Sequence, residues 1–273
     1  YTIAPYILDR NKYLHNHNQG CTTWAAAAPA TRHGTAILAK NRDYLPDHHE
    51  LQCLAWASPA HGYRHIYLTS AGSPGVFSSG MNEVGLAVAD TYVTSRDLGP
   101  GLPRYTVMME LLEHHCNVES ALNYLQNIQH TGDGTLTLLD SRGDMAVFET
   151  GYSNFGVVHS NEGFVVSTNH FVTPQKRKHW IELGSKENQT NSPERYARVS
   201  QAIQSAKDEI DIAWAKKLMA THGGSFHSIC RHPETDSYHS TTISSVLYLP
   251  VERQIFLANG FPCQSNFQKW SLN

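Results

Sequence analysis

The stretch around Cys21 holds the residues whose chemistry is easiest to interpret. A glycine precedes the cysteine and two threonines follow it, in the order Gly20-Cys21-Thr22-Thr23. A thiol attacks a carbonyl only as the thiolate, so it needs a base or a lowered pKa. If the Gly20–Cys21 bond is cut, Cys21 gains an α-amine with a pKa of about 8, which can take the proton from its own thiol. We therefore predict an N-terminal nucleophile, with residues 1–20 as a propeptide or short chain segment. The alternative is that Cys21 is a small buried residue at the start of a strand.

Six short motifs, in chain order, resemble those of a known enzyme family. The motifs are Gly20-Cys21-Thr22-Thr23 followed by Asn41-x-Asp43, then Gly80–Leu86, Ser167–His170, Ser192–Arg198, Phe226–Arg231 and Asn259–Cys263. They are similar to motifs of the N-terminal-nucleophile hydrolases of the acyl-coenzyme A:6-aminopenicillanic acid acyltransferase group. Those enzymes are relatives of the choloylglycine hydrolases, which include bile salt hydrolases and penicillin V acylases. Each motif alone is weak, and their order gives the resemblance its specificity.

The resemblance implies roles for three catalytic residues besides Cys21. Asp43 would accept a hydrogen bond from the amine of Cys21 and hold its lone pair toward the sulfur. Asn169 would point its amide NH₂ at the developing oxyanion, where the loss of one donor costs about 100–1,000-fold in rate. Arg195 would hold the carboxylates of the site or of the substrate.

Four further residues have supporting roles in this interpretation. Lys40 stands where the bile-salt branch has arginine and would place a positive charge beside the thiolate, with a solvated lysine as the alternative. Tyr92 falls where penicillin V acylases carry tyrosine, and the second oxyanion donor would be a backbone N–H on the strand after Gly85. Thr23 offers a hydroxyl for local hydrogen bonding. Arg198 is a second helical arginine, for which a solvated position is the alternative.

The sequence gives little indication of a metal site or a cofactor. His227, Cys230 and His232 are close in sequence, but zinc needs a third and fourth ligand at sensible spacing, and none stands out. The five cysteines are odd in number and scattered, which fits neither a disulfide framework nor a CxxC site. We therefore expect no metal and no organic cofactor.

The expected reaction is hydrolysis of a linear C–N amide in a small N-acyl compound, through a thioester on Cys21. One alternative is an acyltransferase that passes the acyl group to an amine or takes it from acyl-coenzyme A. A second is a papain-like protease pairing Cys21 with a distant histidine, although the Cys-Gly-x-Cys-Trp signature is missing. A third is a non-catalytic relative. Where the acyltransferase has a Ser-Arg pair, this chain has Tyr238-His239. The sequence does not specify which acyl group the substrate carries.

Composition excludes several other partners. The net charge is −3 and no basic stripe is present, so a nucleic-acid partner is not expected. No run of about 18 apolar residues would span a membrane. A cytoplasmic location is favoured, with export as the alternative if a signal is removed before Tyr1.

The elements that position these residues form a layered α+β pattern. Strands are predicted at 35–40, ending at the polar cluster 41–43, and at 63–69, 84–89, 135–139, 145–149, 155–159, 163–167, 241–249 and 254–258. Helices are predicted at 105–115, after Asn117 as N-cap, at 193–205 with Ser192 as cap, and at 208–221. Three hairpins are expected, at 135–149, 155–167 and 241–258. We predict a four-layer αββα sandwich of two antiparallel sheets, with residues 21–273 as a single domain.

Overall fold

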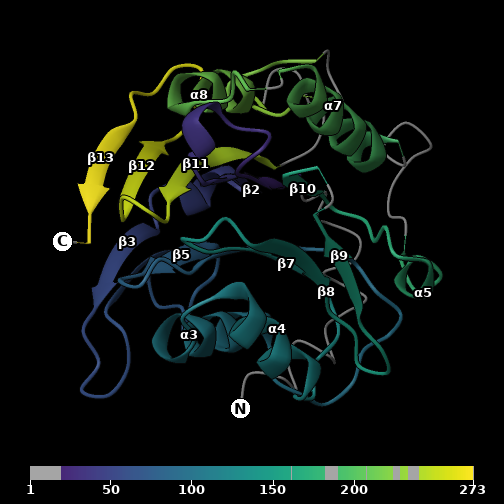
Figure 1. The fold of residues 1–273 in the computed structure, drawn as a ribbon. Helices are drawn as coiled ribbons and strands as arrows, with labels where there is room; N and C mark the ends of the chain where they lie inside the picture. Colours follow the sequence, from purple (N-terminus) through teal and green to yellow (C-terminus); the bar gives the residue numbers. More distant parts are fainter. Residues whose placement is uncertain are drawn as a thin grey trace.

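Two antiparallel sheets stack face to face between helices in the computed structural model (Figure 1). The structure describes residues 20–160, 162–181, 190–206, 208–223, 228–232 and 240–272. Within these residues one sheet has the strand order β10 Phe164–Ser167, β1 Thr22–Ala26, β2 Ile37–Tyr44, β11 Thr241–Leu249, β12 Gln254–Asn259 and β13 Gln268–Ser271. The other has the order β3 Gln52–Ala57, β4 His65–Ser70, β5 Ser79–Asn82, β6 Ala87–Thr91, β7 Thr135–Leu139, β8 Met145–Glu149 and β9 Gly156–His159.

Helices cover the outer faces of both sheets. The six-stranded sheet is covered by α7 Asn191–Ser205 and α8 Ile212–Met219, whereas α3 Arg104–His114 and α4 Val118–Gln126 lie on the seven-stranded sheet (Figure 1). The remaining helical segments are η1 Arg32–Gly34, η2 Pro46–His49 and α5 Pro174–Arg177. This arrangement confirms the predicted αββα sandwich.

The apolar side chains divide according to the alternation of each strand. In β1, Trp24 and Ala26 face the helices α7 and α8, and Ala25 faces the second sheet. In β2, Ile37 belongs to the helix-facing core and Leu38 to the core between the sheets. Because alternate residues of a strand point to opposite faces, the polar continuation of β2 also delivers side chains to both faces.

Several predicted boundaries were wrong, each for a local physical reason. The strand predicted at 35–40 continues to Tyr44, because the polar residues 41–43 find buried partners instead of ending it. The strand predicted at 84–89 is Ala87–Thr91, since residues 82–85 form a turn in which Gly85 adopts φ +89°. The predicted hairpin at 155–167 does not form: β9 pairs with β8, and β10 pairs with β1 of the other sheet.

The helix ends also differ from the prediction. Helix α7 begins at Asn191, and the hydroxyl of Ser192 is engaged with Thr168 and His170 instead of capping the helix. Helix α8 begins at Ile212, where Asp211 caps it by accepting a hydrogen bond from the Trp214 N–H. The prediction that Asn117 caps a helix is confirmed by its bond from the Ser120 N–H.

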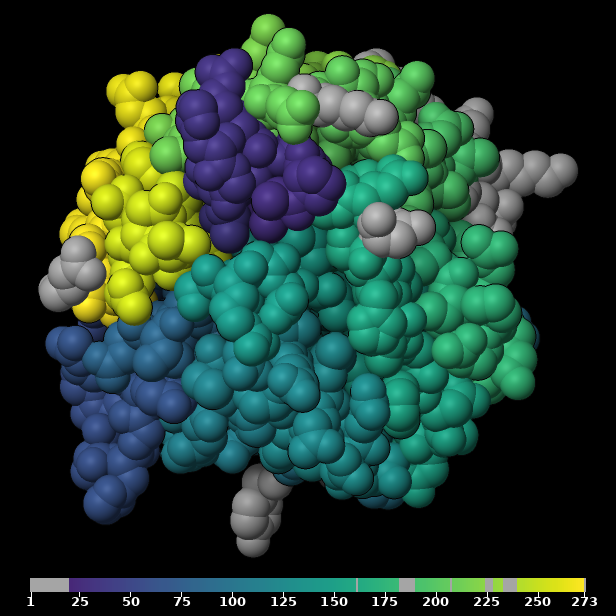
Figure 2. All heavy atoms as spheres, in the orientation of Figure 1, coloured from purple at the N-terminus to yellow at the C-terminus, as the bar shows by residue number. Residues whose placement is uncertain are grey.

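The surface drawn in Figure 2 shows the N-terminal part of the described chain packed against the green segment that precedes and includes α8. Backbone pairing explains this contact, because the Arg32 N–H donates to the Ile210 carbonyl at 2.9 Å. Among the described residues, none of the helices combines the length and the hydrophobicity of a membrane span.

Candidate active site

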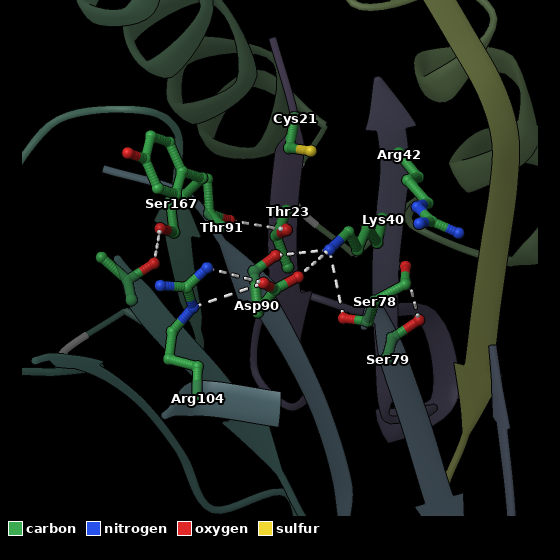
Figure 3. Close-up of polar contacts among 12 residues, drawn as sticks. Cys21, Thr23, Lys40, Arg42, Ser78, Ser79, Asp90, Thr91, Arg104 and Ser167 are labelled. Atoms are coloured by element: carbon green, nitrogen blue, oxygen red, sulfur yellow. Dashed lines mark hydrogen bonds and ion pairs between the residues drawn. The ribbon is translucent and has the colours of Figure 1, made fainter. Parts of the chain in front are cut away.

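Cys21 lies immediately before β1, where this central strand meets the end of β2. Its side chain is buried, and its thiol donates to the Asp43 carbonyl with an Sγ–O distance of 3.7 Å. Thr22 and Thr23 pair with Asn41 and Lys40 in antiparallel register. Figure 3 shows the sulfur at the head of β1, above Thr23 and near the strand that carries Lys40 and Arg42.

The carboxylate of Asp43 lies against the bond that would be cut. Its Oδ1 accepts from the Thr242 hydroxyl at 2.7 Å. A Cβ built on Gly20 would lie 2.7 Å from Asp43 Oδ2 and 1.9 Å from Arg231 Nη1. The space beside the Gly20–Cys21 bond is therefore too small for a side chain unless Arg231 moves.

Arg195 links the nucleophile to Asn169. Its Nη1 donates to the Cys21 carbonyl and to the Thr22 hydroxyl, both at 2.8 Å. Its Nη2 donates to Asn169 Oδ1 at 2.7 Å, and the guanidinium is fully buried. Asn169 in turn donates from Nδ2 to the Tyr92 carbonyl at 2.8 Å. The structure thus brings Arg195 and Asn169, from α7 and the segment after β10, to the start of β1.

Lys40 is the buried member of a chain of charges beneath the cysteine, in which Asp90 and Arg104 are partly buried (Figure 3). Its Nζ is paired with the Asp90 carboxylate and also donates to the Ser78 carbonyl at 3.1 Å. Arg104 bonds the same carboxylate at 3.2 Å and Asp133 at 2.6 Å. Lys40 is 1% exposed, so the alternative of a solvated lysine was wrong.

Burial and neighbouring charges oppose each other at Cys21. Burial raises the pKa of the thiol above its ordinary value, and the positive charge of Lys40 partly offsets this effect. Asp43 and Asp90 push the pKa further up. At Asp90 burial alone would raise the pKa, but Lys40 and Arg104 together hold it below its usual range. An ionised Asp90 therefore lies beneath a thiol that keeps its proton.

A pocket of about 700 Å³ includes Cys21 in its lining. Its charged lining residues are Lys40, Arg42, Asp43, Asp90, Arg104 and Asp133. The remaining wall is largely aromatic, proline and leucine side chains: Tyr44, Pro74, Phe77, Tyr92, Leu98, Pro100, Pro103 and Tyr105. A pocket with many apolar lining residues and a few polar groups is the usual form of a small-molecule site.

The supporting residues occupy different places. Tyr92 lines the pocket, and its ring lies 5.7 Å from the Arg104 guanidinium carbon. The Thr23 hydroxyl pairs with that of Thr91 at 3.1 Å and so connects the two sheets beside the site. Arg198 contacts a different segment, where its Nη1 and Nη2 donate to the carbonyls of His222 and Gly223, each at 3.4 Å.

Sequence reasoning missed Arg42, Asp90, Arg104 and Asp133, which all line the pocket. Asp90 was predictable from the sequence, because it follows the apolar residues of β6 in the same way that Asp43 follows the apolar residues of β2. Sequence reasoning also missed a cluster of possible metal ligands, in which Cys230 and His232 meet His222 and Cys263. His227, the third member of the motif considered from the sequence, lies outside the described residues, as do residues 1–19 and Tyr238-His239.

The stacked antiparallel sheets between helical layers are those of the N-terminal nucleophile hydrolases. The chain belongs to the family described as acyl-coenzyme A:6-aminopenicillanic acid acyl-transferase, which it matches over residues 30–262. The match begins after Cys21, so it covers the pocket walls and Asn169 but not the cysteine itself. No curated protein matches the chain.

Solved structures share the fold at low sequence identity. Penicillin V acylase from Agrobacterium tumefaciens is 16% identical with a TM-score of 0.64, over 92% of this chain and 86% of that one. A conjugated bile acid hydrolase from Clostridium perfringens is 14% identical with a TM-score of 0.62, over 93% and 97%. The Caenorhabditis elegans orthologue of N-acylethanolamine-hydrolyzing acid amidase is 14% identical with a TM-score of 0.58, over 93% and 100%. The fold gives no support to the papain-like alternative.

Proposed function

We propose that Cys21 is an N-terminal nucleophile that cleaves a linear C–N amide bond of a small N-acyl compound. The contact set of Arg195 is the observation that carries this proposal. One buried guanidinium joins the Cys21 carbonyl, the Thr22 hydroxyl and the Asn169 amide. Nothing in the local sequence requires residues 169 and 195 to meet at residue 21, so the convergence supports a shared site.

The base in this mechanism is the α-amine that cleavage of the Gly20–Cys21 bond creates. Burial keeps the Cys21 thiol protonated in the uncut chain, so a proton acceptor is needed. The Asp43 carboxylate lies against Gly20, where it can accept a hydrogen bond from the new amine and orient its lone pair. Lys40 then favours the thiolate, because its positive charge acts on the sulfur.

The acylation step uses the groups around the sulfur in sequence. The thiolate attacks the amide carbonyl, and the oxyanion receives an N–H of Asn169, whose other N–H donates to Tyr92. The protonated α-amine then donates to the leaving nitrogen, which leaves a thioester on Cys21. The neutral amine next activates the water that resolves the thioester. Activity should fall in acid, because the amine stays protonated there.

The pocket favours an apolar or aromatic acyl group. Phe77 and Tyr105 stack with their ring centroids 4.7 Å apart, and prolines line the same pocket. A flat apolar group that packs on these side chains removes hydrophobic surface from water. The polar part of the substrate would face Arg42, Arg104 and the Cys21 end of the pocket.

A panel of N-acyl amides tests the proposal. Aryl-acetyl, fatty acyl, bile-acid and β-alanyl amides are incubated with the purified protein and with Cys21→Ala. We expect release of the free amine from at least one apolar acyl amide, and an acyl mass adduct on Cys21 after rapid acid quench. An amine-releasing activity that Cys21→Ala retains would refute the thioester mechanism.

Acyl transfer is the second candidate, and the family match supports it. Both reactions pass through the same thioester and differ in what resolves it. Partitioning of the acyl-enzyme between water and added 6-aminopenicillanic acid separates them. We expect free acid as the main product, since water needs no dedicated binding site. Quantitative transfer to the added amine would instead make the protein an acyltransferase.

A further inference from the structure

Two cysteines and two histidines, from the segment after α8 and the turn after β12, lie close together. One potential ligand atom from each of His222, Cys230, His232 and Cys263 lies within 4.8 Å of the others. Cys230 Sγ is 3.6 Å from Cys263 Sγ and 3.5 Å from His232 Nε2. His232 Nε2 is 3.1 Å from Cys263 Sγ.

These separations match the edges of a small tetrahedron. With Zn–S of about 2.3 Å and Zn–N of about 2.0–2.1 Å, tetrahedral geometry puts two sulfurs about 3.8 Å apart and sulfur and nitrogen about 3.5 Å apart. The observed sulfur–sulfur and sulfur–nitrogen distances fall within about half an ångström of those values. The ring centroids of His222 and His232 lie 4.9 Å apart, and one ring nitrogen of His222 lies within 4.8 Å of the other three ligand atoms.

From this geometry we propose that His222, Cys230, His232 and Cys263 form a structural zinc site. Two thiolates and two imidazoles are the donor set that zinc takes in closed Cys₂His₂ sites, whereas magnesium and calcium prefer oxygen. Four protein ligands leave no open position for substrate or water, so the metal has no part in the chemistry at Cys21. Binding removes the protons of both thiols.

The surroundings hold the ligands in place. The Cys230 N–H donates to the Thr221 carbonyl at 3.0 Å, which ties Cys230 to the residue before His222. The ring of His232 stacks on Phe261 at 4.1 Å, two residues before Cys263. Arg198 adds a further tie by donating to the His222 carbonyl at 3.4 Å. The site therefore joins the segment after α8 to the turn after β12.

The proposed zinc site also positions Arg231, a residue that lies beside Gly20. Arg231 lies between two ligands, and its guanidinium occupies the space beside Gly20. The Arg231 N–H donates to the Thr242 hydroxyl at 2.8 Å, and that hydroxyl donates to Asp43. The metal thus fixes the residue that packs against the predicted cleavage bond, without contacting the nucleophile.

Metal content tests the site independently of activity. The full chain is purified under reducing conditions and analysed by inductively coupled plasma mass spectrometry, after dialysis against zinc and then buffer. We expect about one zinc per chain. Cys263→Ser should weaken zinc binding by more than roughly 100-fold. This loss of affinity is larger than the one expected when a residue that only supports a ligand is substituted. Cys116→Ser, which removes an exposed cysteine far along the chain, is the matched control and should keep its zinc.

Cobalt(II) gives a readout that does not depend on a stable variant. Wild-type protein loaded with cobalt should show the intense visible bands of a tetrahedral site and a thiolate-to-cobalt charge-transfer band. A protein that takes up neither metal would overturn the proposal. So would zinc retained fully by Cys263→Ser, or a Cys230–Cys263 disulfide in protein kept reduced. A loss of amidase activity with normal zinc content would bear on the proposed function alone.

Discussion

Replacement of Asn169 by alanine separates an oxyanion role from a purely structural one. In the structure the Asn169 side chain donates to the Tyr92 carbonyl and accepts from Arg195 Nη2. Alanine removes both contacts and the second N–H that would face the oxyanion. Cys21 should keep its position in this variant, because Arg195 still donates hydrogen bonds to the Cys21 carbonyl and to the Thr22 hydroxyl.

The two losses have different sizes and affect different measurements. Removal of an oxyanion donor costs about 2.7–4 kcal/mol in the transition state, or about 100–1,000-fold in kcat. Removal of a hydrogen bond to a charged group costs about 1.5–3 kcal/mol of folding stability. We therefore expect a folded variant with moderately reduced stability and a turnover lower by two to three orders of magnitude.

The assay is single-turnover acylation of Cys21 followed by intact mass, with urea unfolding measured on the same preparations. Asn169→Asp keeps an acceptor for Arg195 but removes both N–H donors, so it should lose turnover at least as severely. Asn123→Ala, at an exposed position of α4, is the control and should behave as wild type. An Asn169→Ala acylation rate within about tenfold of wild type, in folded protein, would refute the oxyanion role.

Three further perturbations test the surroundings of the site. Lys40→Met should raise the pKa of Cys21, seen as slower alkylation at a given pH, and should destabilise the fold by at most about 3–5 kcal/mol, because Asp90 loses Lys40 but keeps Arg104 as a partner. The double variant Lys40→Met/Asp90→Asn should recover part of that stability, and no recovery would contradict the pairing. Gly20→Ala should slow cleavage, since its Cβ would meet Arg231, and processing at the wild-type rate would show that the site relaxes freely. Burial, aided by Arg195 and Arg177, lowers the pKa of His170 from 6.5 to about 4. Between these pH values the unfolded chain binds a proton at His170 and the folded chain does not. The free energy of unfolding therefore falls by up to about 3 kcal/mol as the pH decreases from about 6.5 to about 4. In urea unfolding, His170→Asn should flatten the curve in that window, and an unchanged curve would contradict the assignment.

Local patterns allowed much of the fold to be predicted. The strands at 135–139, 145–149 and 241–249 have the predicted bounds, because alternation and turn residues mark both ends of each. The connection between β9 and β10 could not be predicted in the same way. Its turn residues suit a hairpin, and only the packing of the two sheets places the strands in different layers.

The polar contacts of the site show the same limit. Residues such as Cys21 and Asn169 were selected because motifs resembled a family, whereas the link between Lys40, Asp90 and Arg104 joins three segments with no shared motif. The cluster of Cys230 with Cys263 depends on β11 and β12 bringing residues 33 apart in sequence together. Such pairs depend on strand register, which single-sequence spacing does not contain.

The N-terminal sequence and intact mass of the purified protein test the central claim most directly. We expect a chain that begins at Cys21, released by its own thiol, and a Cys21→Ala variant that stays uncut and inactive. An active-site titration of the same preparation should count one reactive thiol for each processed chain. Full amidase activity from protein in which every molecule keeps the Gly20–Cys21 bond would contradict it.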